Sequence, residues 1–201
     1  MKLATTVLLA AAIAVAAPAA RAELSPDPAK LEGGQFAVDK THARIIFSFS
    51  HFGVSTSYGQ FTDFDAKLNF DAKAPAKSAV EVAINMDGIS TNVPKLDAHL
   101  KTGDFFDVAA FPTASFKSTS VEVTGPDTGK ITGNLTVHGV TRPVVLDATF
   151  NAGGVHPMTQ KYVVGFNAKG QIKRSEFGVG RYAPNVGDDV TLTISAEFVR
   201  Q

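Results

Sequence analysis

The stretch ARIIFSFS, residues 43–50, alternates between apolar and polar side chains and decides the fold class. Ile45, Phe47 and Phe49 occupy every second position, and serines follow the two phenylalanines. Because successive side chains of a β-strand point to opposite faces of the sheet, this period of two predicts a strand with one apolar face. The same period returns along most of the chain, so we predict an all-β protein.

Further strand-like segments are separated by short sequences rich in Gly, Pro, Asn and Asp, which are typical of turns. The apolar register slips between Phe61 and Phe64, which predicts a bulge or bend near Thr62 and Asp63 within one long strand. About eight or nine strands with short connections suggest an up-and-down antiparallel barrel, with a β-sandwich as the alternative. Beyond residues 43–50, we expect strands over residues 56–70, 78–86, 113–123, 130–137, 143–150, 162–173 and 189–200.

One segment, from Asp87 to Pro112, lacks the alternation. Pro94 can open a short helix over residues 94–101, and the sequence DFFD at residues 104–107 suggests a turn. We therefore expect a helical cap here rather than another strand. Its apolar side chains, which lack strand spacing, are Leu96, Leu100, Phe105, Phe106 and Phe111.

The first 22 residues have the layout of a secretory signal peptide. Lys2 supplies a positive start, Val7–Ala17 is apolar, and Ala20–Ala22 is a small-residue cleavage site. A membrane anchor is the alternative, but the apolar run is short for a bilayer. We expect cleavage after Ala22, export to the periplasm, a flexible lead-in over residues 23–34 and a barrel domain over residues 35–201.

The composition argues against several classes of function. The chain carries 19 basic and 19 acidic residues, so it has no excess of positive charge with which to bind nucleic acid. It has no Cys, so its stability in an oxidising compartment must come from burial without disulfides. We therefore predict no nucleic-acid partner, and the length suits one domain with a full core.

The polar residues offer weak candidates for chemistry. The five His residues show neither an HExxH motif nor a close pair of metal ligands, so we predict no metal site. Asp63 and Asp65 would share a strand face, and Asp97 could hydrogen-bond to His99 across the cap. Either pair could do acid–base work, but exposed strand charges and closure of the cap are commoner roles. We predict no catalytic residue and no cofactor.

Phenylalanine gives the strongest remaining signal, because the chain has 15 Phe and no Trp. A barrel with many rings on one face contains either a solid core or an apolar cavity, and small eight-stranded barrels show both. Burying a methylene group is worth about 0.8 kcal/mol, so a lipid could bind in such a cavity without any charge. Lys173, Arg174 and Arg181 form a basic cluster that could meet an anionic head group, although most such clusters are solvated.

Several motifs, in a fixed order and spacing, are similar to one known family. They are FAVDKTHARI (36–45), FSFSHFGVS (47–55), GQFTDF (59–64), DAHLK (97–101), DFFDVAAFP (104–112) and GNLTVHGVTRPV (133–144). Over residues 35–200 the chain closely resembles the YceI-like family of periplasmic polyisoprenoid-binding proteins. Ala43 departs from the family pattern, which often has Ser at that position, and this puts a polar contact there in doubt.

The resemblance implies an extended, lipocalin-like, eight-stranded antiparallel barrel with a short helical cap near one end. It also implies an apolar tunnel that holds a polyisoprenoid or a related amphiphile, such as a quinone or fatty amide, for transport, storage or scavenging. The family is not known as a catalytic one. Some members are encoded with membrane-bound cytochromes, so transient contact with a membrane or such a cytochrome is a further expectation.

Strand parity, together with the cap, identifies the candidate ligand-contacting side chains. Parity does not separate those that touch a ligand from those that pack the closed end. We predict the following residues: Ile45, Phe47, Phe49, Phe64, Leu68, Phe70, Val82, Ile84, Leu100, Phe105, Phe106, Phe116, Leu135, Phe166, Leu192 and Ile194.

Two other functions stay open at this point. One is an enzyme acting on a small amphiphile, with Asp97 and His99 or Asp63 and Asp65 as its acid–base groups. The other is a stress protein whose barrel is a scaffold for a protein partner. The oligomeric state is also open, because an exposed edge in an incompletely closed barrel could pair two chains into a dimer.

Overall fold

The computed structural model describes residues 24–201, so the expected signal peptide over residues 1–22 lies outside the described residues. None of the helices in the described range is long and apolar enough to span a membrane. The helical elements are η1 (Pro28–Lys30), η2 (Lys40–His42), η3 (Pro75–Lys77), η4 (Met86–Gly88), α1 (Pro94–Leu100) and η5 (Arg174–Phe177), where η marks a 3-10 turn. The strands are β1 (Gly34–Val38), β2 (Arg44–His51), β3 (Ser55–Phe61), β4 (Phe64–Phe70), β5 (Ala79–Asn85), β6 (Ile89–Ser90), β7 (Thr113–Val123), β8 (Thr128–Val137), β9 (Val140–Val155), β10 (Tyr162–Lys173) and β11 (Val186–Arg200).

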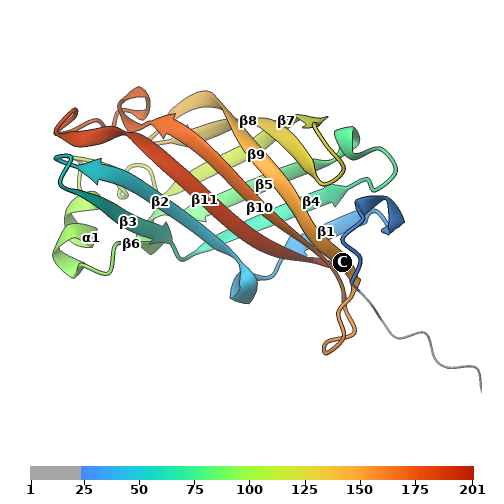
Figure 1. The fold of residues 1–201 in the computed structure, drawn as a ribbon. Helices are drawn as coiled ribbons and strands as arrows, with labels where there is room; N and C mark the ends of the chain where they lie inside the picture. Colours follow the sequence, from blue (N-terminus) through green and yellow to red (C-terminus); the bar gives the residue numbers. More distant parts are fainter. Residues whose placement is uncertain (1–23) are drawn as a thin grey trace, which may run out of the picture.

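The strands form one antiparallel sheet that closes on itself, as Figure 1 shows. Within residues 24–201, eight strands make the closed ring, in the order β1-β4-β5-β7-β8-β9-β10-β11 and back to β1. Closure depends on β11, which pairs with β10 along one edge and with both β1 and β2 along the other. The predicted eight-stranded antiparallel barrel is confirmed, and the sandwich alternative is wrong.

The single long strand expected over residues 56–70 is wrong, because the segment forms two strands with different partners. β3 pairs with β2, whereas β4 pairs with β1 and β5. The chain bends between them at Thr62 and Asp63, where the Thr62 amide donates to the Gly88 carbonyl and Asp63 accepts from the Asn85 amide. β1 and β2 are likewise separated by η2, so the β2–β3 hairpin extends beyond the closed ring.

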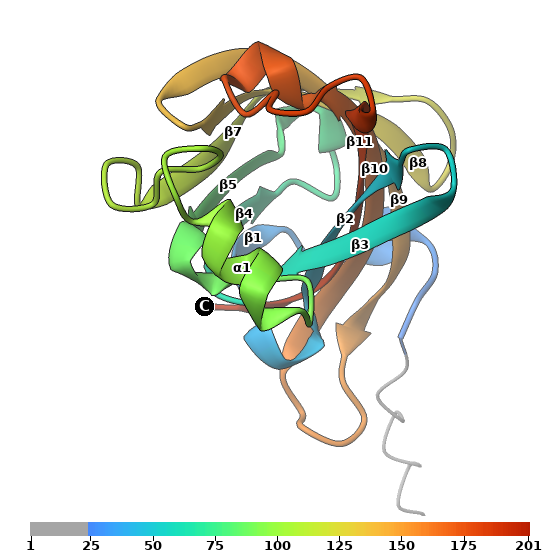
Figure 2. The same cartoon turned by 90° about the vertical axis from the view of Figure 1, so that its left-hand side faces the viewer.

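The sheet has an edge where the β2–β3 hairpin extends from the ring. Beyond β3, the described sheet ends with the two-residue strand β6, while β7 continues from β5. Residues 91–112, which connect β6 to β7, contain α1 and the turns after it. Figure 2 shows α1 lying in front of the strands at this end of the barrel. The helical cap predicted from Pro94 is therefore confirmed, one residue shorter than expected.

The opposite end of the barrel contains a tight aromatic core. Phe36 is 1% exposed, and its ring meets Phe70 edge-on with the centroids 6.3 Å apart. Phe150 and Phe166 make a similar contact at 5.4 Å. Because aromatic rings bury large apolar areas and favour edge-to-face pairs, this cluster packs one end of the barrel tightly, and we call it the closed end for that reason.

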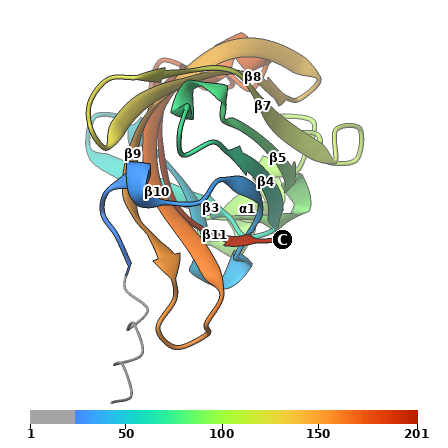
Figure 3. The same cartoon turned by 90° about the vertical axis from the view of Figure 1, so that its right-hand side faces the viewer.

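The described part of the expected lead-in packs on this closed end, as Figure 3 shows. Leu31 is buried in the core, and Ser25 forms a backbone bridge with Gly153. Glu32 accepts from the Arg200 side chain, and its amide donates to the Tyr162 hydroxyl at 2.7 Å. This packing departs from the flexible lead-in that the Pro and Gly content of the segment predicts.

Substituting Phe36 by Ala should lower the free energy of unfolding by about 3–5 kcal/mol, because a fully buried ring would leave a cavity in the closed end. Urea unfolding followed by circular dichroism measures this change. Val123→Ala is the control, since Val123 is 53% exposed and its truncation should cost less than about 0.5 kcal/mol. Equal losses in the two variants would contradict this assignment of the core.

Candidate ligand-binding cavity

The described part of the barrel encloses two neighbouring apolar cavities. The larger has a volume of about 410 Å³ and lies toward α1, with Leu100 and Phe177 in its wall. The smaller, of about 200 Å³, lies toward the closed end, with Phe70 and Phe150 in its wall. Five residues line both cavities, and we call them the waist: Ile45, Val82, Phe116, Leu146 and Ile194. The cavities therefore follow one another along the barrel, with a wholly apolar waist between them.

The interior stays hollow because large side chains face glycines on neighbouring strands. Gly59 is the direct cross-strand partner of Phe47, and a Cβ added to it would lie 2.2 Å from Cζ of that ring. Gly133 of β8 is the partner of Ser118 and lies diagonally across from Phe116, and a Cβ added to it would lie 2.4 Å from Cζ of the Phe116 ring. Each ring thus occupies the space of a missing side chain and lies along the wall. The phenylalanines line the cavities without filling them.

All sixteen side chains predicted from strand parity and the cap lie on the wall of one or both cavities, and their contact with a ligand stays a prediction. Four of them belong to the waist: Ile45, Val82, Phe116 and Ile194. The larger cavity adds Phe47, Phe49, Ile84, Leu100, Phe105, Phe106, Leu135 and Leu192. The smaller cavity adds Phe64, Leu68, Phe70 and Phe166.

Sequence reasoning missed two kinds of lining residue. Val144 and Leu146 follow the inward parity of β9, and a fuller use of alternation would have found them. Phe177, Val179 and Tyr182 come from η5 and the loop after it, where the sequence has no alternation of apolar and polar residues. Their position depends on how this loop folds over the end of the barrel.

The mouth of the larger cavity lies between the cap, residues 94–111, and the loop of residues 178–185. The Asp104 carboxylate joins the two, because it accepts from the Arg181 guanidinium and lies 3.2 Å from Nε2 of His99. The Phe105 ring packs edge-on against His99 at 5.1 Å and lies 6.1 Å from the Tyr182 ring. One ion pair and one aromatic contact thus hold the cap to the loop.

The two expected acid–base pairs do not form sites. Asp97 accepts from the amide and hydroxyl of Thr91, both at 2.6 Å, and the expected bond between Asp97 and His99 is wrong, since His99 contacts Asp104 instead. Asp63 and Asp65 are exposed on the outer surface, where both pair with the Lys40 ammonium. Among these candidates, all of them in the described range, His99 alone borders a cavity.

The basic cluster of the C-terminal half is held within the fold. Arg174 is buried, and its guanidinium donates to four backbone carbonyls of residues 179–187 at 2.6–2.9 Å. Burial lowers the pKa of Arg174 from its ordinary value. Lys173 pairs with Asp189 at 2.8 Å. Arg174 therefore fixes the loop that forms one side of the mouth.

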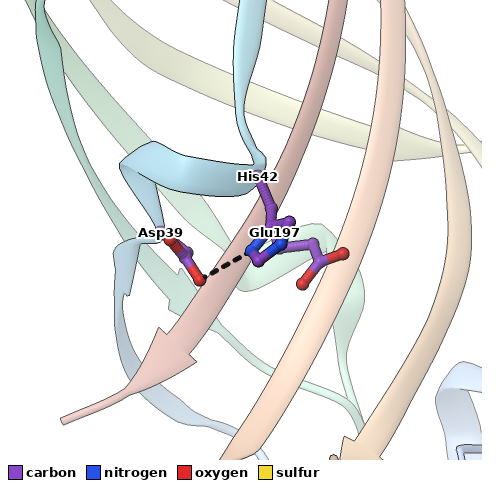
Figure 4. A group of neighbouring side chains, drawn as sticks. All are labelled: Asp39, His42 and Glu197. Atoms are coloured by element: carbon purple, nitrogen blue, oxygen red, sulfur yellow. Dashed lines mark hydrogen bonds and ion pairs between the residues drawn. The ribbon is translucent and has the colours of Figure 1, made fainter.

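A separate polar group, shown in Figure 4, lies on the outside of the barrel. One ligand atom from each of Asp39, His42 and Glu197 falls within 4.8 Å of the others. Asp39 also caps η2 by accepting from the Thr41 amide at 2.9 Å. Hydrogen bonds from Thr41 and His42 lower the pKa of Asp39 to about 2, and the bond to Asp39 with the charge of Glu197 raises the pKa of His42. Spacing missed the group because Glu197 comes from the other end of the sequence.

A closed antiparallel barrel with an apolar interior and a capped mouth defines the class of small-ligand-binding barrels. Within this class, the model of the YceI-like domain matches residues 36–198, and the chain belongs to the YceI-like family. The resemblance inferred from the sequence motifs is thereby confirmed. Protein YceI of Salmonella arizonae is 41% identical over 169 residues, which cover 83% of this chain and 87% of that protein.

Two solved structures share the fold at low sequence identity. BcnA of Burkholderia cenocepacia has a TM-score of 0.73 at 22% identity and covers 80% of this chain and 98% of its own. A polyisoprenoid binding domain from Saccharophagus degradans, implicated in plant cell wall breakdown, has a TM-score of 0.63 at 11% identity. It covers 83% of this chain and 98% of its own. The barrel architecture is thus shared with proteins whose sequences have diverged widely.

Substituting Gly59 by Ala should push the Phe47 ring into the larger cavity, because the new methyl group would take the space that the ring occupies. We expect a loss of about 1–3 kcal/mol in the free energy of unfolding from overpacking. We also expect weaker binding of a fluorescent fatty acid probe. Gly103→Ala is the matched control, since a Cβ there would meet no atom within 4 Å. An unchanged affinity in Gly59→Ala would contradict the role of this glycine.

The Asp39–His42 pair should stabilise the fold most between about pH 4 and pH 6.5. The raised pKa of His42 gives stability that is present below its ordinary value of 6.5 and is lost as the pH rises through the raised value. The lowered pKa of Asp39 gives stability that is present above its ordinary value of 3.8 and is lost as the pH falls toward about 2. Urea unfolding of the wild type and of His42→Gln should therefore differ more at pH 5 than at pH 9.

The matched background for this measurement is Asp39→Asn, which keeps an oxygen that can accept from the Thr41 amide but removes the charge. In that background the pH dependence of the His42→Gln effect should shrink. A dependence of the same size with Asn at position 39 would show that another group causes it.

Proposed function

We propose that this protein holds a polyisoprenoid or a similar long-chain amphiphile, such as a quinone or a fatty amide, inside the barrel. The observation that supports this most is the succession of two apolar cavities joined at a wholly apolar waist. A long, thin molecule can occupy both cavities at once, whereas a compact ligand would use one of them. The polyisoprenoid binding domain with the same fold supports this ligand class.

The cavity walls make a polar anchor unnecessary for affinity. Each methylene transferred from water into the barrel contributes about 0.8 kcal/mol, so an acyl or isoprenoid chain several carbons long gains enough to bind. Polar side chains border both cavities, and at the mouth of the larger one these are His51, His99 and Tyr182. The mouth is where the cap meets the loop of residues 178–185, so in this proposal the head group stays near these three side chains and the apolar chain runs toward the smaller cavity.

The place of action is the periplasm, and the role is transport, storage or scavenging of the bound lipid. The N-terminal signal pattern and the family membership support this compartment. A ligand of this kind is supplied and taken up by a membrane, directly or through a membrane-bound cytochrome. The protein is a binding protein in this proposal, and His99 serves the closure of the cap rather than catalysis.

Mass spectrometry of a solvent extract from the gently purified native protein tests the ligand directly. We expect a long-chain amphiphile, and Val82→Phe should lower the amount of lipid per protein about tenfold by blocking the waist, which the ring would overfill. Val145→Phe is the control, because Val145 lies on the outer face of β9 and is 46% exposed. A packed barrel without extractable lipid, or equal loading of the two variants, would defeat the proposal.

The cap should control exchange of the ligand more than it controls folding. Phe105→Ala or Phe106→Ala removes a ring beside the mouth, and the Phe105 ring contacts both His99 and Tyr182. We expect lipid transfer to acceptor vesicles to become several-fold faster, since closing the mouth depends on these rings. Phe70→Ala, at the closed end, should instead lower stability with little effect on transfer. Faster transfer in Phe70→Ala, with mainly a loss of stability in the two cap variants, would contradict this assignment of exchange to the cap.

A further inference from the structure

The mouth end of the barrel exposes a group of large apolar side chains, which we call the rim: Phe52, Val54, Val93 and Tyr182. Their exposed fractions are 58%, 86%, 52% and 51%. Phe52 and Val54 lie at the tip of the β2–β3 hairpin, Val93 precedes α1, and Tyr182 lies in the loop before β11. Figure 2 views the barrel from this end and shows the three elements around it.

The hairpin tip and the loop form a continuous surface. The Phe52 amide donates to the Asn185 carbonyl at 2.8 Å, and Val186 is the cross-strand partner of His51. The Tyr182 ring packs toward Phe105 of the cap. The rim therefore borders the same mouth that the cap and the loop form.

Two rim aromatics are held in a backbone conformation that disfavours them. Phe52 has a φ of 54° and Tyr182 a φ of 64°, in the left-handed region where bulky side chains are uncommon. The turn of residues 51–54 has positive φ at both central positions, for which Asn-Gly is the preferred pair. An exposed Phe at this position gains little from folding and costs backbone strain. Such strain at an exposed aromatic points to a function outside the folded core.

The rim is continuous with the interior of the barrel. Tyr182 is half exposed and also lines the larger cavity, and His51, next to Phe52, lines it as well. An apolar molecule leaving the cavity would thus meet the rim before it met water. Because of this continuity, we expect the partner that docks on the rim to be the source or the destination of the ligand.

The charges around the rim fit a lipid surface. The Arg181 guanidinium lies over the Tyr182 ring at 5.1 Å, and Lys95 is exposed in the first turn of α1. The nearby Asp104 is paired with Arg181 and His99. Aromatic side chains with flanking cations are typical of segments that lie in the head-group region of a bilayer, where cations reach phosphates and rings reach the acyl boundary.

We propose that the protein docks on a lipid bilayer through the rim, with Phe52, Val54 and Tyr182 inserted at head-group depth and the mouth facing the membrane. This inference rests on the proposed function, because a lipid cargo gives the mouth a reason to meet a bilayer. Docking lets the cargo pass between bilayer and cavity without exposing its apolar chain to water.

Flotation of the full chain with vesicles of phosphatidylethanolamine and phosphatidylglycerol tests the docking. The double variant Phe52→Asn and Tyr182→Asn should bind about tenfold less, because two inserted rings are lost. Asn tolerates the left-handed φ at both positions, which offsets the loss of the Tyr182 contact with Phe105. Circular dichroism and urea unfolding check that the variant is folded, and the single variant Phe52→Asn, which leaves Tyr182 and the cap contact intact, should show part of the same loss. Met158→Asn is the control, since Met158 is 87% exposed in the β9–β10 loop, away from the mouth.

Each outcome of the flotation decides the proposal. Selective loss in the double variant supports it. A wild type that does not float, equal binding of wild type and double variant, or equal loss in Met158→Asn would overturn it. Binding to native membrane vesicles without binding to pure lipid would assign the rim to a membrane protein instead. Solvent extraction measures the lipid bound in the barrel independently of flotation. A protein that floats but contains no lipid would therefore contradict the proposed function and still support the docking.

Discussion

The two-sided pairing of β11 is the interaction on which the other features of this barrel depend. Its backbone pairs with β10 along one edge, and with β1 and then β2 along the other. The β1 contact closes the ring, and the β2 contact carries the β2–β3 hairpin beyond it. Because one strand serves both purposes, the barrel has a tightly packed end and a flared end. The cap and the mouth occur at the flared end for this reason.

The hollow interior follows from a second constraint, which is local pairing of large with small residues. Small eight-stranded barrels have just enough room for their side chains to fill the inside. Here Gly59 and Gly133 leave space on the wall that Phe47 and Phe116 occupy. The rings therefore contribute apolar surface without blocking the lumen. This barrel thus keeps a cavity despite its 15 phenylalanines.

Alternation predicted most of the fold and the cavity wall, and it failed where the chain leaves the period. The strands at 113–123 and 162–173 have the expected bounds, and the thirteen strand residues predicted to face inward line the cavities. The bend predicted near Thr62 and Asp63 is present, but the single strand expected over residues 56–70 is wrong, because a change of strand partner leaves the same slip in the sequence as a bulge does. The Asp97–His99 bond was also wrong, since Thr91 and Asp104 compete for these side chains.

By itself the sequence determined the strands, the inward faces, the cap and the family, because these depend on short-range periods and on motifs in a fixed order. Only the tertiary structure decided that the interior is hollow, that Asp104 joins Arg181 to His99, and that Phe52 and Tyr182 share one rim. These features join residues far apart in the chain. Their contacts depend on barrel closure and loop conformation. A local sequence pattern does not give the distance between two residues that lie far apart in the chain.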